Sequence, residues 1–171
     1  MDNNIRKKLI AMGLSGAIAL GGALLAPFEG KVNKVYVDPV GILTSCYGHT
    51  GPELKKGQQF TDDQCLDQLA KDLLEHNKIL TNVVKVELTP YEHAAFLSFL
   101  YNVGPGKKGV KDGFVTLKNG NQSTMLRKLN AGDKVGACNE LLKWTKAGGV
   151  VLKGLVKRRT EERNVCLGNL N

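Results

Sequence analysis

The sequence predicts an α+β fold in which a small sheet lobe precedes a larger helical lobe. Residues 29–60 are rich in Gly, Val, Tyr and Thr with alternating character, which is typical of short strands. From residue 61 onward, apolar residues follow a helical spacing, and capping residues mark where helices begin and end. Two lobes of this kind are expected to leave a cleft between them, where a ligand would bind.

Length and composition limit the class of protein. The 171 residues suffice for one domain with an extension, and the net charge of +8 favours a polyanionic partner. That partner could be nucleic acid, an anionic membrane surface or a cell-wall glycan, and solubility alone is the remaining explanation. The 24 Lys and Arg residues are scattered and only 6% of residues are aromatic, which argues against a stacking platform for nucleic acid.

An uncharged run, residues 9–28, follows the basic flank Arg6-Lys7-Lys8. Twenty helical residues rise about 30 Å, the thickness of bilayer hydrocarbon, and the basic flank would stay cytoplasmic. Ten of the eighteen residues from Leu9 to Ala26 are Gly, Ala or Ser, so the run buries little apolar area in lipid. We therefore expect an anchor that can leave the bilayer and pack elsewhere.

Three other interpretations of this run remain. A cleaved signal peptide is disfavoured because Leu24-Leu25-Ala26 has a bulky residue at the outer position of the cleavage site. A permanent anchor is the second. A core helix is the third, and it is disfavoured because no polar face interrupts the run. Replacing Gly21 and Gly22 by leucine should hold a releasable anchor in the membrane.

Capping residues predict the helices after residue 60. Thr61 and Gln64 form a capping box, and residues 89–104 repeat the device with Thr89 as N-cap and Gly104 as terminator. A loop rich in Gly and Lys follows, from residue 104 to residue 120. Further helical patterns cover residues 123–130, 133–148 and 151–167.

The four cysteines are Cys46, Cys65, Cys138 and Cys166. None belongs to a CxxC pair, so zinc binding is poorly supported. An even count behind a secretory-type N-terminus indicates two disulfides in an oxidising compartment, whereas four buried thiols would fit a cytosolic protein. Of the three possible pairings we favour Cys46–Cys65 with Cys138–Cys166, because each closes a short loop.

A tight hairpin is predicted around residues 36–44. Asp38-Pro39-Val40-Gly41 fits a type I turn, and Gly41 suits the left-handed residue of a bulged three-residue loop. Such a loop pairs Asp38 with Ile42 and Tyr36 with Thr44. Because side chains alternate along a strand, Asp38, Tyr36 and Thr44 would then share one face.

Two carboxylates next to this hairpin suit the hydrolysis of a glycosidic bond. That reaction uses a protonated carboxyl, kept neutral by apolar surroundings, and a second, ionised carboxylate. Glu29 follows Pro27-Phe28 and is the candidate acid, Asp38 at a solvated turn is the ionised partner, and Thr44 could hold the attacking water. From spacing alone, Glu29 and Asp38 could equally be a helix-terminal acid and a turn residue.

The whole constellation resembles a known family. Glu29, Asp38, Thr44 and Gly48-His49, at these spacings, are similar to the active-site signature of the phage-type lysozymes. The similarity continues in "YNVG" (101–104), "LRKLNAGD" (126–133), "WTKAGG" (144–149) and "GLVKRRTEER" (154–163). The N-terminal run and the four cysteines resemble signal-anchor-release endolysins of lambdoid phages.

This resemblance implies a lysozyme-like fold and a peptidoglycan hydrolase that cuts between N-acetylmuramic acid and N-acetylglucosamine. It implies Glu29 as general acid, Asp38 as the carboxylate that positions or activates water, and Thr44 as the water-orienting partner. Tyr101 and Ser123 match positions that line the substrate cleft. The family is generally described as inverting. We expect no metal, no cofactor and no nucleic-acid partner, and we expect a monomer.

The resemblance also implies that the chain has two segments with different roles. Residues 1–28 would be the anchor segment and residues 29–171 the catalytic domain. The protein would face the periplasm, inactive, while residues 9–28 hold it in the host inner membrane, and would become active after release into the periplasm. Since Glu29 directly follows the run, we infer that a membrane-held anchor keeps it from Asp38. The alternatives are a non-catalytic, membrane-anchored peptidoglycan-binding protein and a basic DNA-binding protein.

Five residues carry further expectations. Cys46 and Tyr47 stand where many family members have Gly and an aliphatic residue, and a disulfide at Cys46 would brace the hairpin. His49 is expected to form structural ion pairs or hydrogen bonds rather than act as a base. Arg158 and Arg159 are expected either to stabilise the fold or to face the glycan.

Overall fold

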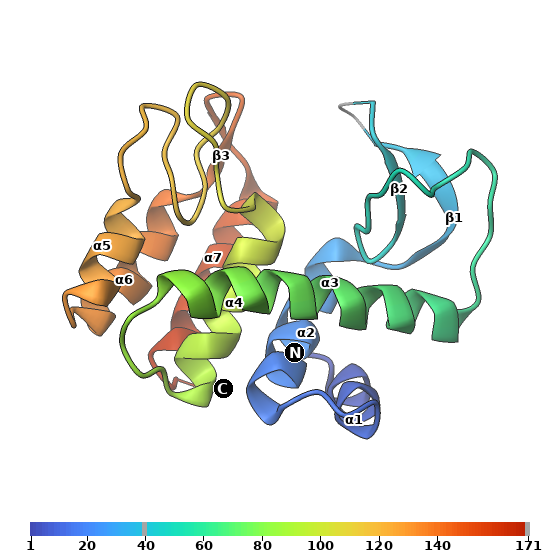
Figure 1. Cartoon of the computed structure of the whole chain (residues 1–171), viewed down its shortest axis with the longest axis horizontal. Coiled ribbons are helices and arrows are strands. Elements are labelled where there is room, and N and C mark those ends of the chain that lie inside the picture. The colour runs from blue at the N-terminus through green and yellow to red at the C-terminus, as the bar shows by residue number, and fades with distance from the viewer. Residues whose placement is uncertain (39–40, 170–171) are drawn as a thin grey trace.

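The computed structural model describes residues 1–38 and 41–169, which fold into a strand lobe and a helical lobe connected by one long helix (Figure 1). The helices are α1 (Asn3–Ala11), α2 (Gly16–Glu29), α3 (Asp62–Val83), α4 (Pro90–Val103), α5 (Thr124–Asn130), α6 (Lys134–Glu140), a 3₁₀ turn (Leu141–Lys143) and α7 (Lys153–Cys166). The strands are β1 (Val32–Val37), β2 (Leu43–Cys46), β3 (Lys146–Ala147) and β4 (Val150–Val151). Helix α3 connects the two lobes. The small strand lobe and the larger helical lobe confirm the predicted α+β architecture.

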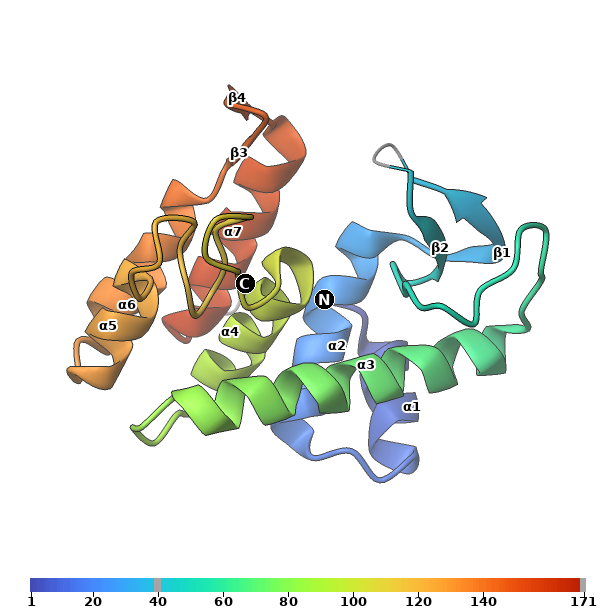
Figure 2. The same cartoon turned by 45° about the horizontal axis from the view of Figure 1, so that its top comes forward.

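The small lobe is built on the antiparallel pair β1 and β2. The register shifts between Val32 and Tyr36, which indicates an irregularity in β1. Next to it, the Val35 amide donates to the Gln58 carbonyl over 2.8 Å, so the loop before α3 lies along the outer edge of β1. Figure 2 shows this lobe standing over one end of α3, with the C-terminal end of α2 at its base.

The helical lobe contains α4 to α7 and the short pair β3 and β4. Both predicted capping boxes are present, at the start of α3 and of α4. The helix predicted over residues 133–148 is wrong in its second half. It ends after Lys143, and Gly148 and Gly149, with φ of +56° and +81°, turn the chain into the β3–β4 hairpin instead.

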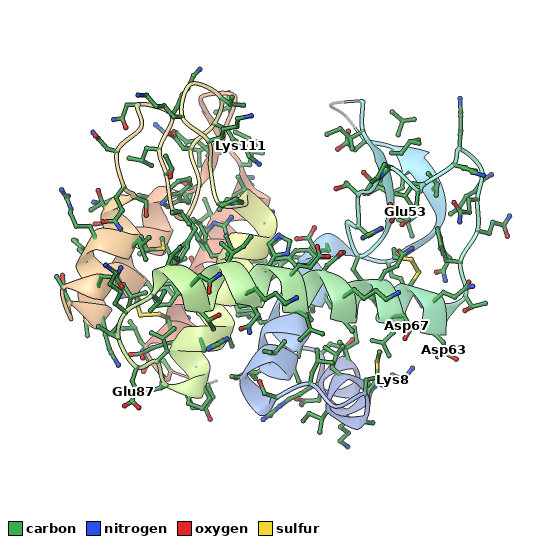
Figure 3. All side chains as sticks on the ribbon, viewed as in Figure 1. Lys8, Glu53, Asp63, Asp67, Glu87 and Lys111 are labelled. Carbon is green, nitrogen blue, oxygen red and sulfur yellow. A yellow bond between two sulfur atoms is a disulfide. The ribbon has the colours of Figure 1, made fainter. Side chains whose placement is uncertain are left out.

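Two disulfides staple these lobes, and they are the pairs that loop length favours (Figure 3). Cys46–Cys65 joins the end of β2 to α3 across 19 residues, and Cys138–Cys166 joins α6 to α7 across 28 residues. Closing loops of these lengths stabilises a fold by about 3 kcal/mol each in the chain-entropy account. Cys46 has φ of +52°, a left-handed backbone conformation that favours glycine.

The apolar run of residues 9–28 is divided between two helices in this structure. Helix α1 has 9 residues and α2 has 14, and the hydroxyl of Ser15 caps α2 by accepting from the Ile18 amide over 3.4 Å. No helix within residues 1–38 and 41–169 is long and apolar enough to cross a membrane. The boundary expected after residue 28 falls inside α2, so both sides of it belong to one folded unit here.

Helix α2 lies at the centre of the molecule. It is buried from Ile18 to Ala26 and packs against α1, α3, α4 and α7. A helix that is apolar on all sides is stable when it is surrounded, so rejecting a core helix for this run was wrong for this conformation. The packing is close: a Cβ on Gly22 would lie 2.4 Å from Leu9 Cδ1 and 2.8 Å from Leu73 Cδ1.

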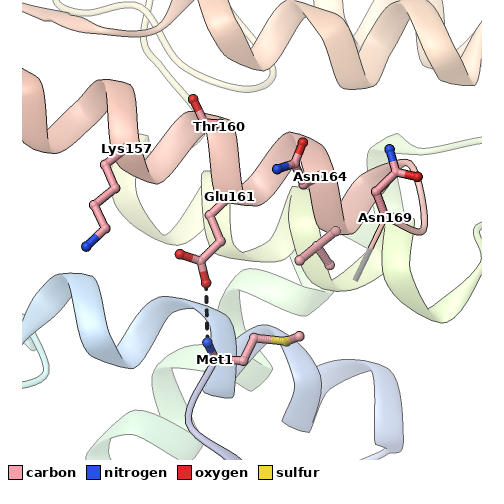
Figure 4. A pocket seen from close by; sticks show the side chains of 7 residues that line it. Met1, Lys157, Thr160, Glu161, Asn164 and Asn169 are labelled. Carbon is pink, nitrogen blue, oxygen red and sulfur yellow. Dashed lines mark hydrogen bonds and ion pairs between the residues drawn. The ribbon is translucent and has the colours of Figure 1, made fainter. Parts of the chain in front are cut away.

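The residues before the run also have places in the fold. The Met1 ammonium lies 3.3 Å from a carboxylate oxygen of Glu161 on α7 (Figure 4). The Asp2 amide donates to the Ala23 carbonyl over 2.8 Å, and the Asp2 carboxylate accepts from the first amides of α1. A cavity of about 400 Å³ adjoins Met1 and Glu161. The N-terminus is therefore docked on α2 and α7.

Candidate active site

Glu29 is the last residue of α2, where that helix reaches the small lobe. Its carboxylate accepts a hydrogen bond from Arg158 Nη1 over 2.7 Å and is 17% exposed. It lines a cavity of about 470 Å³ together with Pro27, Phe28, Asn102, Leu152, Gly154, Leu155 and Arg158. The apolar neighbours Pro27 and Phe28 do line this cavity, but an arginine from the far end of the chain also pairs with Glu29.

Arg158 is held rigidly. It is 4% exposed, its Nε donates to Glu162 over 3.0 Å, and its Nη2 donates to the Ser98 carbonyl over 3.3 Å. Its guanidinium also lies 5.5 Å from the centre of the Phe28 ring. Arg159 is equally buried and donates to Glu162 and to Asn102. Both arginines are therefore buried and serve the fold, and Arg158 also lines the cavity of Glu29.

A turn of the small lobe closes over Glu29. Gly48 has φ of +78°, and a Cβ there would lie 3.0 Å from Glu29 Oε2, so only glycine allows this approach without a shift. The Tyr101 hydroxyl donates to the Tyr47 carbonyl over 2.8 Å and thereby ties the turn to α4. Glu29 is thus enclosed by α7 on one side and by this turn on the other.

The predicted register of the β1–β2 hairpin is confirmed. Tyr36 is paired with Thr44, and the Asp38 amide donates to the Ile42 carbonyl over 2.9 Å. Gly41 has φ of +87°, as the bulged loop requires. The residues at the centre of the predicted type I turn, Pro39 and Val40, lie outside the described residues.

Asp38 and Thr44 are fixed by local hydrogen bonds. Asp38 Oδ1 accepts from the Ile42 amide over 2.8 Å, and Thr44 Oγ1 donates to the Ile42 carbonyl over 3.2 Å. The confirmed register and the alternation of side chains put Asp38, Tyr36 and Thr44 on one face. Neither Asp38 nor Thr44 lines the cavity of Glu29. They lie on the hairpin whose second strand leads into the turn at Gly48.

Ser123 and Tyr101, the two residues expected to bind substrate, form hydrogen bonds within the protein. Ser123 is fully buried, caps α5 by accepting from the Leu126 amide over 3.1 Å, and donates to the Phe114 carbonyl. Its side chain therefore serves the fold in this conformation, and its role in substrate binding stays a prediction. Tyr101 is partly buried, and burial, together with the charges of Asp72 and Glu29, raises the pKa of its hydroxyl. Its hydroxyl bonds to the Tyr47 carbonyl and to Asp72 Oδ2, and Tyr101 is not among the residues that line the cavity of Glu29.

Behind the turn, His49 forms the structural ion pairs expected of it. Its Nδ1 lies 2.9 Å from Asp72 Oδ2, and its Nε2 lies 2.6 Å from Glu53 Oε1 (Glu53 is labelled in Figure 3). Burial opposes the charged imidazolium, but the hydrogen bonds with Glu53 and Asp72 outweigh it and raise the pKa of His49. Burial raises the pKa of Asp72 against the opposing effect of His49.

The raised pKa of His49 makes the fold depend on pH. Because His49 has a higher pKa in the folded protein, it stabilises the fold fully when the pH is below its ordinary pKa of about 6.5. This stabilisation is lost as the pH rises through the pKa that His49 has in the folded protein. His49→Gln should therefore lower the melting temperature more at pH 6 than at pH 9. Thermal unfolding followed by circular dichroism measures this difference.

His93 provides a control of opposite sign. It bonds to Asn77 instead of a carboxylate, and burial lowers its pKa. His93→Gln should therefore cost less stability at pH 6 than at pH 9. Equal losses for His49→Gln at both pH values would contradict the charged pairing of His49.

Comparison with known proteins identifies the class. Residues 26–162 match the phage lysozyme family, so the chain belongs to that family and is a glycoside hydrolase. It is similar to the SAR-endolysin of Bacteriophage PS119, with 39% identity over 173 residues that cover 98% of this chain and 96% of the relative. It also resembles the muramidase domain of SpmX from Asticaccaulis excentricus, with 28% identity, a TM-score of 0.71, and coverage of 86% of this chain and 94% of that domain.

A third protein is known in two conformations. The active form of the P1 phage endolysin Lyz matches with a TM-score of 0.79 over 99% of this chain and 95% of that protein, at 23% identity. The secreted inactive form of Lyz matches with a TM-score of 0.57 over 89% and 96%, at 21% identity. The fold of this chain, including its N-terminal helices, is thus nearer to that of the active form.

Proposed function

We propose that this lysozyme is a monomeric endolysin that hydrolyses the bond between N-acetylmuramic acid and N-acetylglucosamine in peptidoglycan and so lyses the host cell. Glu29 gives a proton to the leaving oxygen, Asp38 positions or activates the attacking water, and Thr44 orients that water. The observation that carries the proposal is the position of Glu29. Its carboxylate lines a cavity of about 470 Å³ formed by residues of α2 and α4 and by the start of α7, and it accepts from Arg158 over 2.7 Å.

The chemistry divides between the two lobes. As the bond between the anomeric carbon and the glycosidic oxygen breaks, the Glu29 proton moves to that oxygen. Water adds to the anomeric carbon from the other face of the sugar and loses its proton to Asp38, so the charges balance. Thr44 is 5% exposed and is anchored to the Ile42 carbonyl, which suits a group that holds one water in one place.

We further propose that residues 9–28 first hold the protein in the host inner membrane, facing the periplasm, and that the released chain folds as described above. Two features support this. Ten of eighteen residues in the run are small, so its hold on lipid is weak. The same residues fill the protein core as α2, which gives the released segment somewhere to bury its apolar surface.

Release would assemble the site. Glu29 ends α2, whereas Arg158 and Gly48 belong to the lobes on either side of it. If α2 lies in the membrane, Glu29 stays at the lipid surface and is separated from Arg158. We therefore propose that the tethered enzyme is inactive because its general acid is out of position.

The enzymatic proposal is tested by analysis of the products. The purified protein should release fragments from Gram-negative peptidoglycan whose reducing ends are N-acetylmuramic acid, identified by mass spectrometry after borohydride reduction. Reducing ends of N-acetylglucosamine would contradict the proposed bond. Binding to peptidoglycan without any new reducing ends would support the alternative, a non-catalytic membrane-anchored binding protein.

Release is tested by intact-mass measurement of protein from membrane and soluble fractions of expressing cells. The soluble, active protein should retain Met1, because Met1 and Asp2 are docked on α7 and α2. A soluble form that always begins after residue 26 would indicate cleavage instead of release.

A further inference from the structure

The buried acid Glu162 has no part in the chemistry proposed so far. It is fully buried in α7, where Oε1 accepts from Arg158 Nε over 3.0 Å and from Ser98 Oγ over 2.8 Å, and Oε2 accepts from Arg159. A buried charge is costly unless it is paired and hydrogen-bonded, and here every carboxylate oxygen has a partner. Since an apolar side chain would fill the same space without this cost, we expect the contacts of Glu162 to have a role beyond packing.

The contacts of Glu162 lead directly to Glu29. Arg158 uses Nε for Glu162 and Nη1 for Glu29, over 3.0 and 2.7 Å, so one guanidinium connects the two carboxylates. Because a guanidinium is planar and rigid, fixing its Nε end also fixes the direction of its Nη1 end. Ser98 holds both partners in place through its hydroxyl and its carbonyl.

Charge balance gives Glu162 a second effect on Glu29. Arg158 and Arg159 are both buried, Arg158 bonds to Glu29, and Glu162 bonds to both arginines. With Glu162 present, the four groups sum to zero when Glu29 is ionised and to one positive charge when it carries a proton. Without Glu162 each of these sums would be one positive charge higher, so Glu162 makes the surroundings of Glu29 less positive.

Other charged groups face Glu29 less directly. Tyr101 on α4 lies near enough for the charge of Glu29 to raise the pKa of its hydroxyl, and Gly48 brings only backbone. The small lobe contributes Asp38 on the hairpin and, behind the turn, His49 with Asp72. Among the described residues, Glu162 is the acid that bonds to both Arg158 and Arg159, so it is the balancing charge within α7 itself.

We propose that Glu162 is a positioning residue of this lysozyme: it fixes Arg158 against Glu29 and offsets the charge of the two buried arginines beside that candidate acid. The inference rests on the proposed role of Glu29 as general acid. It assigns Glu162 no contact with substrate.

The test is the pH dependence of peptidoglycan hydrolysis by Glu162→Gln. Glutamine keeps the shape and one acceptor but removes the charge. The alkaline fall of activity should move to lower pH by about one unit, so that at neutral pH the rate drops roughly tenfold and acidification restores much of it. Glu162→Asp, which keeps the charge, should return the profile to that of the parent protein even if it unfolds at lower temperature.

Glu140→Gln is the matched control. Glu140 is also a buried acid, paired with Lys128 and Lys143 at 2.7 and 2.9 Å, but it does not contact Arg158 or Arg159. It should lose stability without any shift of the pH profile. A folded Glu162→Gln protein with an unshifted profile would overturn the inference and leave the hydrolase proposal standing. Full activity of Glu29→Gln would overturn both.

If Glu162→Gln does not fold, Arg159→Gln provides the second measurement. It removes one of the two buried positive charges and leaves the Arg158–Glu29 pair in place. The alkaline limb should then move to higher pH. If the alkaline fall of activity stayed at the same pH as in the parent protein, the inference would be overturned.

Discussion

Replacing Glu29 by glutamine is expected to abolish clearing of permeabilised Gram-negative cells while leaving the protein folded. Glutamine has the same volume, and its Oε1 can still accept the hydrogen bond from Arg158 Nη1 that Glu29 accepts at 2.7 Å. It cannot give a proton to the leaving oxygen. Loss of a positioned general acid lowers a rate by about 10²–10⁴-fold, and we expect the upper end here because the uncatalysed leaving group is a poor one.

The measurement is the initial rate of turbidity loss, with circular dichroism as the check on folding. Glu161→Gln is the matched control, since Glu161 lies on the outer side of α7 and pairs only with the Met1 ammonium among the described residues. It should clear cells at a rate within about twofold of the parent protein. If Glu29→Gln cleared cells as fast as Glu161→Gln, Glu29 could not be the general acid.

How far the sequence anticipates this site depends on how local each contact is. The hairpin register follows from Asp38 and Gly41 alone, because turn chemistry acts over four residues. The capping boxes at Thr61 and Thr89 are local in the same way. The disulfide pairs follow from short loops, and the structure contains both.

The contacts of Glu29 could not be predicted in this way. Arg158 lies 129 residues away in the chain, and a buried ion pair at that separation leaves no local pattern. A signal for Glu162 does exist: Arg158 and Arg159 stand four and three residues before it, the spacing at which helical side chains meet. That spacing indicates a salt bridge but does not reveal its burial or its link to Glu29.

The N-terminal run shows a different limit. Hydropathy shows that a segment avoids water, but it does not show whether the segment lies in lipid or in a protein core. The break between α1 and α2 and the burial of α2 depend on close contacts with Leu9, Leu73 and Leu97. The glycines that weaken an anchor are, in this fold, also the positions where neighbouring helices approach.

Replacing Gly22 by leucine is accordingly expected to have two large effects. In the membrane it adds apolar area and strengthens the anchor. In the folded protein the first added atom would already lie 2.4 Å from Leu9 Cδ1 and 2.8 Å from Leu73 Cδ1. Overpacking of a core costs about 1–3 kcal/mol or more, and a whole leucine side chain between α1 and α3 should prevent α2 from docking. We expect no measurable lysis.

Gly16→Leu separates the two effects, because it adds the same side chain to the same run where a Cβ meets nothing within 4 Å. Both variants should be retained in membranes more than the parent protein. The soluble fraction of Gly16→Leu should keep the parent's specific activity and melting temperature, whereas protein of Gly22→Leu extracted from membranes should stay inactive. If extracted Gly22→Leu matched Gly16→Leu in specific activity, close packing at Gly22 would not be needed, and retention in lipid would be the whole effect.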